Sequence, residues 1–83
     1  MRRNMKERSM KIDIRGIEKR AQRVKKVSGE LDKIEGGDYA DIVADDERML
    51  GLAPKIINSI GKAKFIKSWE GDDGYFHTLV EKE

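Results

Sequence analysis

The sequence predicts an α/β (α+β) two-layer sandwich, in which two helices cover one face of a four-stranded mixed sheet. Three observations lead to this fold class. The apolar residues change between the two-residue period of strands and the three-to-four-residue period of helices in the order βαβαββ. A glycine-rich loop near the end indicates an antiparallel hairpin. The length of 83 residues suffices for one small core. We therefore expect residues 11–83 to form a single domain, preceded by a basic, disordered extension over residues 1–10.

The first half of the domain predicts a strand, a helix and a second strand. Residues 11–14 alternate in polarity and stop at Gly16, which is typical of a short strand. Apolar residues then follow at steps of three and four, which predicts a helix over 17–34. Gly29 would bend this helix or end it early, because glycine costs about 1 kcal/mol relative to alanine inside a helix. Residues 39–45 alternate again and predict the second strand.

The second half predicts a helix and a hairpin. Pro54 suits the first position of a helix, where its missing N–H is not needed, so we expect a helix over 54–60 that ends at Gly61. Strands over 65–70 and 75–81 flank the loop Gly-Asp-Asp-Gly. Because strand–helix–strand connections share one hand, both helices should lie on the same face of the sheet.

The other face of the sheet should then be uncovered, and three aromatic residues bear on it. Phe65, Trp69 and Tyr75 either complete the core and its edge or lie on the uncovered face, where they would mark a partner surface. The pattern favours the core position, because large aromatic side chains are mostly buried in small domains.

The composition excludes several classes of protein. Charged residues make up 41% and hydrophobic residues 37%, but the hydrophobic ones are patterned, which indicates a folded domain. There is no cysteine, and therefore no disulfide, thiolate nucleophile or sulfur-based zinc site. No apolar run approaches the roughly 18 residues of a membrane span. We expect a cytoplasmic protein without a membrane partner, and the high Lys and Glu content would suit a thermophile.

The net charge of +2 is distributed unevenly along the chain. Residues 1–26 contain eleven lysines and arginines against three acidic residues, a net charge of +8. Such a basic segment is typical of nucleic-acid binding. Part of this positive charge depends on the translation start, because Met5 and Met10 are alternatives to Met1. A chain starting at Met10 would have a net charge of −1.

Three short motifs occur in a characteristic order and spacing. They are Asp13-Ile14-Arg15-Gly16-Ile17, then Asp45-Asp46-Glu47 with Leu52-Ala53-Pro54 four residues later, then Gly61-Lys62-Ala63-Lys64-Phe65. Across residues 11–82 the chain resembles the TusA/SirA family of small sulfur-carrier proteins, which has D-x-R-G-L, D-D-P with D-I-P, and G-H-x-V in these places. The resemblance implies the same βαβαββ sandwich.

The resemblance fails at the residue that carries sulfur in that family. Where the family has x-C-P-x-P at the start of the first helix, this chain has Lys19, Arg20 and Gln22 in place of the cysteine and the two prolines. A persulfide carrier needs a thiolate, which lysine cannot replace. We therefore expect no sulfur transfer, and we name no catalytic residue.

Basic residues stand in place of that cysteine, and they are the candidate site. Arg15, Lys19, Arg20 and Arg23 could gather at the start of the first helix and bind a phosphate or an acidic partner, with Arg20 and Arg23 both exposed. The alternative, which we favour, is a solvated helix face.

Other candidate sites are weaker. Five carboxylates in two turns could bind a divalent cation, but acidic turns are common and the spacing is not that of an EF-hand, so we expect no metal and no cofactor; they are Asp45, Asp46, Glu47, Asp72 and Asp73. His77, the single histidine, is predicted to be a surface or edge residue rather than a ligand or a base.

Three functions remain. The first is a non-catalytic, cysteine-free relative of the sulfur carriers that acts as a protein-interaction or regulatory module. The second is an RNA- or DNA-binding protein that uses the basic N-terminal third. The third, an enzyme, has the least support, because no nucleophile with a plausible activating group can be named.

Overall fold

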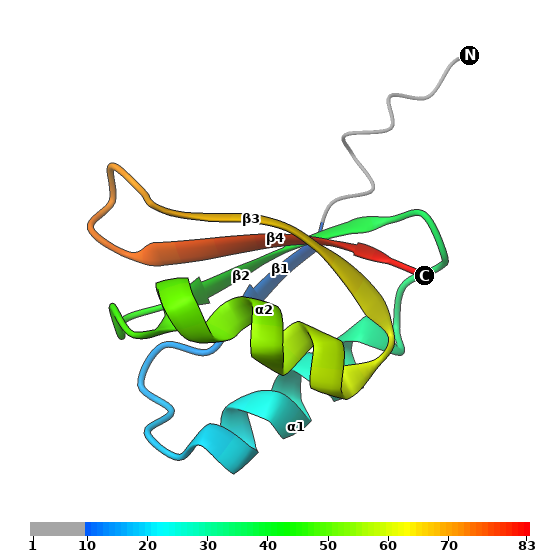
Figure 1. Ribbon diagram of the computed structural model, residues 1–83, viewed down its shortest axis with the longest axis horizontal. Coiled ribbons are helices and arrows are strands. Elements are labelled where there is room, and N and C mark those ends of the chain that lie inside the picture. Colours follow the sequence, from blue (N-terminus) through cyan, green and yellow to red (C-terminus); the bar gives the residue numbers. More distant parts are fainter. Residues whose placement is uncertain (1–9) are drawn as a thin grey trace.

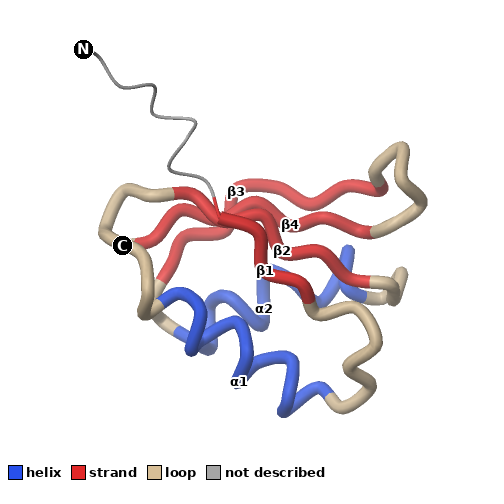
Figure 2. The backbone as a smooth tube through the Cα atoms, turned by 180° about the vertical axis from the view of Figure 1, so that it is seen from behind, coloured by secondary structure: helices blue, strands red, loops and turns tan. Residues whose placement is uncertain are grey.

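A computed structural model describes residues 10–83 of the chain and confirms the two-layer sandwich (Figure 1). Both helices lie on one face of the sheet (Figure 2). The predicted extension falls outside the described residues except for Met10, which begins the first strand. In chain order the elements are β1 (Met10–Asp13), α1 (Arg20–Leu31), β2 (Tyr39–Ala44), α2 (Met49–Ile60), β3 (Ala63–Glu70) and β4 (Phe76–Lys82).

The strands pair in the order β1-β2-β4-β3. β1 is parallel to β2, whereas β4 is antiparallel to both β2 and β3. β3 therefore runs in the same direction as β2, with β4 inserted between them. This insertion places the last strand of the chain in the middle of the sheet and leaves β1 and β3 as the two edges.

The core lies between the sheet and the helices. Ile12, Ile42 and Thr78 are neighbours in register on adjacent strands, and all three are buried on the helix side. The helices bury apolar stripes against this face, as the periodicity predicts, except that Ala21 at one of the predicted apolar steps of α1 is exposed and Arg23 is buried. The buried residues of the helices are Arg23, Val27 and Leu31 in α1, and Met49, Ala53, Ile56 and Ile57 in α2.

α1 is shorter than the predicted helix over 17–34. Ile17 and Ile34 belong to the apolar stripe and pack against the core, but both lie in the flanking loops. Each donates its N–H in a tight turn, Ile17 to the carbonyl of Ile14 and Ile34 to that of Leu31, both at 3.3 Å. The prediction of the ends was wrong because loop residues can continue the apolar pattern of a helix. Gly29 lies inside α1, two residues before its end.

α2 begins five residues earlier than predicted, and Pro54 lies inside it rather than at its first position. An interior proline leaves the carbonyl four residues before it, here that of Leu50, without its helical donor. The hydroxyl of Ser68 on β3 donates to this carbonyl at 3.1 Å and replaces the missing bond. The far end agrees with the prediction, because Gly61 ends α2 with a left-handed φ of 74°.

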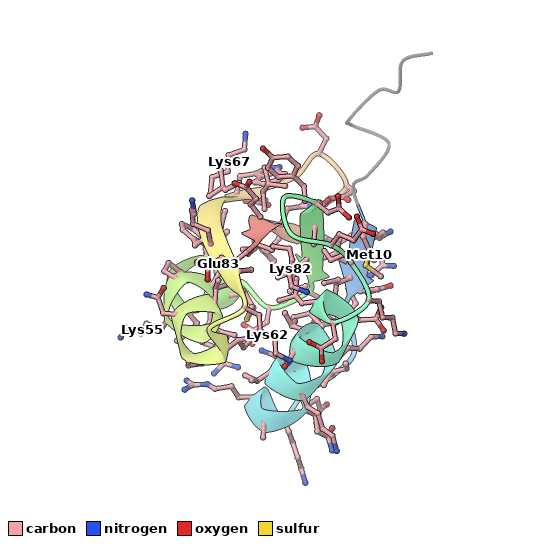
Figure 3. The ribbon with its side chains drawn as sticks, turned by 90° about the vertical axis from the view of Figure 1, so that its right-hand side faces the viewer. Met10, Lys55, Lys62, Lys67, Lys82 and Glu83 are labelled. Atoms are coloured by element: carbon pink, nitrogen blue, oxygen red, sulfur yellow. The ribbon has the colours of Figure 1, made fainter. Side chains whose placement is uncertain are left out.

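Two lysines from the other half of the chain cap the C-terminal end of α1 (Figure 3). Lys82 Nζ donates to the carbonyls of Leu31 and Ile34 at 2.6 and 3.0 Å. Lys62 Nζ donates to Ser28 Oγ at 2.8 Å and pairs with Asp32 Oδ1 at the same distance. Cations are favourable at this end of a helix, where free carbonyls and the negative end of the dipole meet.

Candidate functional site

The turn after β1 contains Arg15, the first residue of the predicted cationic site. The carboxylate of Asp13 accepts bonds from Arg15 Nε at 2.8 Å, from Nη2 at 2.6 Å and from the backbone N–H at 3.0 Å. These bonds hold the pKa of Asp13 well below its ordinary value and raise that of Arg15. The guanidinium also lies over the ring of Tyr75, 4.6 Å from its centroid. Arg15 is therefore paired within the domain.

Arg23 is buried, which corrects the prediction of an exposed side chain. Only 7% of the residue is exposed. Its Nε donates to the carbonyl of Ile17 at 2.6 Å and its Nη1 to Asp46 Oδ2 at 3.2 Å. Arg23 lies four residues before Val27 on the inner stripe of α1, so its position faces the core and not the solvent.

The predicted acidic turn after β2 also forms internal bonds. Asp46 accepts bonds from Nε, Nη2 and the backbone N–H of Arg48, which lower the pKa of Asp46, with Arg23 adding to the effect. Asp45 accepts the N–H of Gly16 at 2.9 Å and so ties this turn to the one after β1. Within residues 10–83, no three histidine or acidic side chains are grouped so that they could hold a metal ion.

Lys19 and Arg20 are exposed at the start of α1. Lys19 is the N-cap residue, its side chain makes no capping bond, and the first turn contains no acidic residue. Neither side chain forms an ion pair with another of the described residues. The structure therefore divides the predicted site: Arg15 and Arg23 are paired internally, whereas Lys19 and Arg20 extend from the helix start.

The uncovered face of the sheet carries a row of three residues that crosses three strands, with aromatic rings on two of them. Val43, His77 and Trp69 are cross-strand neighbours on β2, β4 and β3. They lie opposite the face of Ile42 and Thr78, which points to the helices. Phe65 packs against the core, as predicted. The prediction that Trp69 completes the core was wrong, because the pairing irregularity between Phe65 and Lys67 reverses the alternation of β3 and places Trp69 beside His77 on the uncovered face.

His77 is enclosed by charged and aromatic neighbours. Its Nδ1 lies 3.0 Å from both carboxylate oxygens of Asp41, and its Nε2 lies 3.1 Å from both oxygens of Asp73. Its ring stacks on Trp69 at a centroid distance of 5.2 Å and an interplanar angle of 13°. The side chain is only 12% exposed. His77 is not at an edge of the sheet, because β4 is a central strand; it lies on the uncovered face, where its neighbours cover most of the ring.

The edge strand β3 presents a second set of residues, which we call the β3 strip: Lys64, Ile66, Lys67 and Trp69. The ammonium of Lys67 lies 5.1 Å from the centroid of the Trp69 ring, and Figure 3 shows Lys67 on the side of the sheet away from the helices. Ile66 lies at an irregularity in the pairing and is 41% exposed. The sequence contained a signal for this strip, since lysine and tryptophan two residues apart on a strand share one face.

Comparisons with known proteins add no relative. No protein-family model matches the chain, no curated protein matches it, and no solved structure matches it. The resemblance to the TusA/SirA family therefore stays a prediction. Neither helix within residues 10–83 has the length and apolar character needed to cross a membrane.

Proposed function

We propose that this chain is a non-catalytic protein-interaction module, a cysteine-free relative of the TusA/SirA sulfur carriers, which acts in the cytoplasm. Its β3 strip binds a segment of a partner protein that presents carboxylates beside apolar side chains. The observation that carries this proposal is the pairing of Lys67 with the ring of Trp69 beside the exposed Ile66. Aromatic anchors next to charged groups are typical of the residues that dominate binding energy at protein interfaces.

Charge complementarity defines the partner. Lys64 and Lys67 are exposed, and neither forms an ion pair with another residue of the described part of the chain. Carboxylates of a partner would neutralise them, while its apolar side chains would cover Trp69 and Ile66.

The rest of the uncovered face disfavours a nucleic acid as the partner. Asp13, Asp41 and Glu81 occupy the same face as Lys67 and would repel a phosphate backbone. Residues 10–83 carry a net charge of −1, because residues 1–9 hold four of the basic residues and one acidic residue. A protein segment with alternating acidic and apolar residues fits this mixed surface better than a polyanion.

Binding can be tested with a fluorescein-labelled peptide of alternating glutamate and leucine, using fluorescence anisotropy. The variant Lys64→Glu/Lys67→Glu should bind this peptide at least about tenfold more weakly than the wild type, because two attractive charges become repulsive. The matched control is Lys25→Glu/Lys26→Glu, which makes the same charge change at exposed positions of α1. This control should bind the peptide like the wild type, apart from a small long-range effect.

Two results would contradict the proposal. One is equal weakening by the two double variants, which would mean that only net charge matters. The other is tighter binding of a single-stranded oligonucleotide of the same charge, with a steep loss of affinity at higher salt, which would favour the nucleic-acid function.

The inability to carry sulfur, one part of the proposal, has its own test. Incubation with a cysteine desulfurase and labelled cysteine should leave no sulfur label on the protein, because the chain contains no thiol. A covalent label on the chain would refute this part.

A further inference from the structure

His77 has carboxylates at both of its ring nitrogens. Asp41 faces Nδ1 and Asp73 faces Nε2, each within hydrogen-bond distance. An imidazolium donates from both nitrogens, whereas a neutral imidazole donates from one and presents a lone pair at the other. Only the protonated ring can donate to both carboxylates at once, and removal of the proton leaves one carboxylate facing a lone pair.

We propose that His77 is a proton switch for the β3–β4 hairpin loop: the imidazolium holds loop 71–74 against β4 through Asp73, and loss of the proton releases the loop. The switch regulates the same surface that the β3 strip belongs to, because Trp69 stacks on the His77 ring. Its link to partner binding rests on the proposed function, but release of the loop does not.

The positions of the two carboxylates decide which one separates. Asp41 lies on β2, which is paired on both sides, with β1 and with β4. Asp73 lies in an exposed loop, where its Oδ1 also accepts the N–H of Tyr75 at 3.0 Å. Loop residues move at lower cost than residues of a central strand. The neutral ring therefore keeps its N–H toward Asp41 and turns its lone pair toward Asp73.

Other charged groups around the ring do not replace the proton. From β1, Lys11 lies opposite Asp41 in register, one strand further from the ring. From β3, Lys67 lies over Trp69 and not over His77. From the loop, Asp72 is exposed and makes no bond to the ring. Asp73 therefore keeps the bond from the Tyr75 N–H, and His77 is the side chain of the sheet that ties it to β4.

The backbone of the loop passes close to the His77 ring at Gly71. A Cβ atom at this position would lie 2.7 Å from both His77 Nε2 and Asp73 Oδ1, so any side chain here would displace one of them. The Gly71 N–H donates to the carbonyl of Tyr75 at 2.8 Å and closes the loop. Close approach of the backbone to a functional group is one of the positions that require glycine.

Electrostatics sets the pH range of the switch. Burial lowers the pKa of His77, but the hydrogen bonds and charges of Asp73 and Asp41 outweigh it and raise the pKa above 6.5. The ring is consequently protonated at mildly acidic pH and loses its proton above pH 6.5. Because deprotonation removes a positive charge beside Trp69 and frees a negative one, an acidic partner should bind the strip more weakly as the pH rises.

The chain offers a direct measurement, because it contains one histidine and one tryptophan. In the full chain, NMR titration of the His77 ring protons should give a midpoint above 6.5, and the fluorescence of Trp69 should change with the same midpoint. The hydrogen-exchange protection factors of the Gly71, Gly74 and Tyr75 amides should fall as the pH rises through this midpoint. Protection factors are used because they already correct for the intrinsic effect of pH on exchange.

Asp73→Asn is the test variant, and Asp72→Asn, which makes the same charge change one residue away, is its matched control. Asp73→Asn should lower the midpoint and reduce loop protection at acidic pH, whereas Asp72→Asn should resemble the wild type. Gly71→Ala should reduce loop protection with both carboxylates retained.

A wild-type midpoint at or below 6.5, or equal protection of the loop amides on both sides of the midpoint, would overturn the switch. Loop release without any binding of the glutamate–leucine peptide would support the switch and contradict the proposed function. Peptide binding together with a loop that does not respond to pH would support the proposed function and contradict the switch.

Discussion

Replacement of Arg23 by methionine should destabilise the domain strongly, because Arg23 connects α1 to two loops from within the core. Methionine keeps the apolar stem of the side chain and removes the guanidinium. The change leaves the carbonyl of Ile17 without its 2.6 Å donor, and a buried acceptor without a partner costs about 1–3 kcal/mol. It also removes the 3.2 Å ion pair with Asp46.

The structure limits the size of this effect. Loss of one partner of a buried ion pair costs about 3–5 kcal/mol when the other charge is left uncompensated. Here Asp46 keeps the bonds from Arg48, so we expect a total loss of about 2–4 kcal/mol for Arg23→Met. A chain of 83 residues has a stability of about 4–12 kcal/mol, at roughly 0.05–0.15 kcal/mol per residue. The variant should therefore retain a fold of marginal stability.

Thermal unfolding followed by circular dichroism measures this loss. The Tm should fall by about 8–32 °C, at roughly 4–8 °C per kcal/mol for a domain of this size. Arg20→Met is the matched control, since Arg20 is exposed on the same helix and should change the Tm by only a few degrees at most. Equal Tm values for the two variants would refute the assignment of Arg23 to the core.

Three further predictions concern the contacts that join distant parts of the chain. Ser68→Ala should cost about 1 kcal/mol in the wild type and less in a Pro54→Ala background, where the new N–H donates to the Leu50 carbonyl; an additive double-mutant cycle in urea unfolding would contradict this. Lys82→Met should cost about 1–2 kcal/mol because it uncaps α1, whereas the exposed Lys55→Met should cost less than about 0.5 kcal/mol; similar losses would refute the capping role. The unfolding free energy should be greatest between pH 3.8 and 6.5. Asp13 and Asp46, whose pKa is lowered in the fold, stabilise it fully above pH 3.8, and this stabilisation is lost as the pH falls. His77, whose pKa is raised, stabilises the fold fully below pH 6.5, and this stabilisation is lost as the pH rises. Urea unfolding curves measured over a range of pH would contradict this prediction if the unfolding free energy were greatest at alkaline pH.

Sequence patterns predicted which face of most elements is buried, and the structure agrees at particular residues. The alternation around Ile42 predicted its face correctly, because successive strand residues point to opposite sides whatever the strand pairs with. Gly61 ended α2 as expected, because the left-handed conformation of a helix end is a local requirement. The same local reasoning misplaced Pro54, because the hydroxyl that satisfies the orphaned carbonyl comes from another element.

The candidate site was harder to predict than the fold. Arg15 was correctly placed at the end of β1, but its pairing with Asp13 and its position over Tyr75 were not predicted. Arg23 was assigned to the solvent on its residue type, although its spacing from Val27 put it on the inner stripe. A charged residue on an apolar stripe indicates a buried ion pair when a partner exists, and that partner, Asp46, lies 23 residues away.

The sequence by itself determined the order of the elements, the buried faces of most of them and the absence of a thiol, since these depend on residue types and on the repeat of the backbone. Only the tertiary structure decided that β4 lies between β2 and β3. That order places His77 beside Asp41 on β2, 36 residues away in the chain, and beside Trp69 on β3, the other strand that flanks β4. The physical reason is that periodicity reports which way a side chain points, whereas its neighbours are set by which strands pair and in what register.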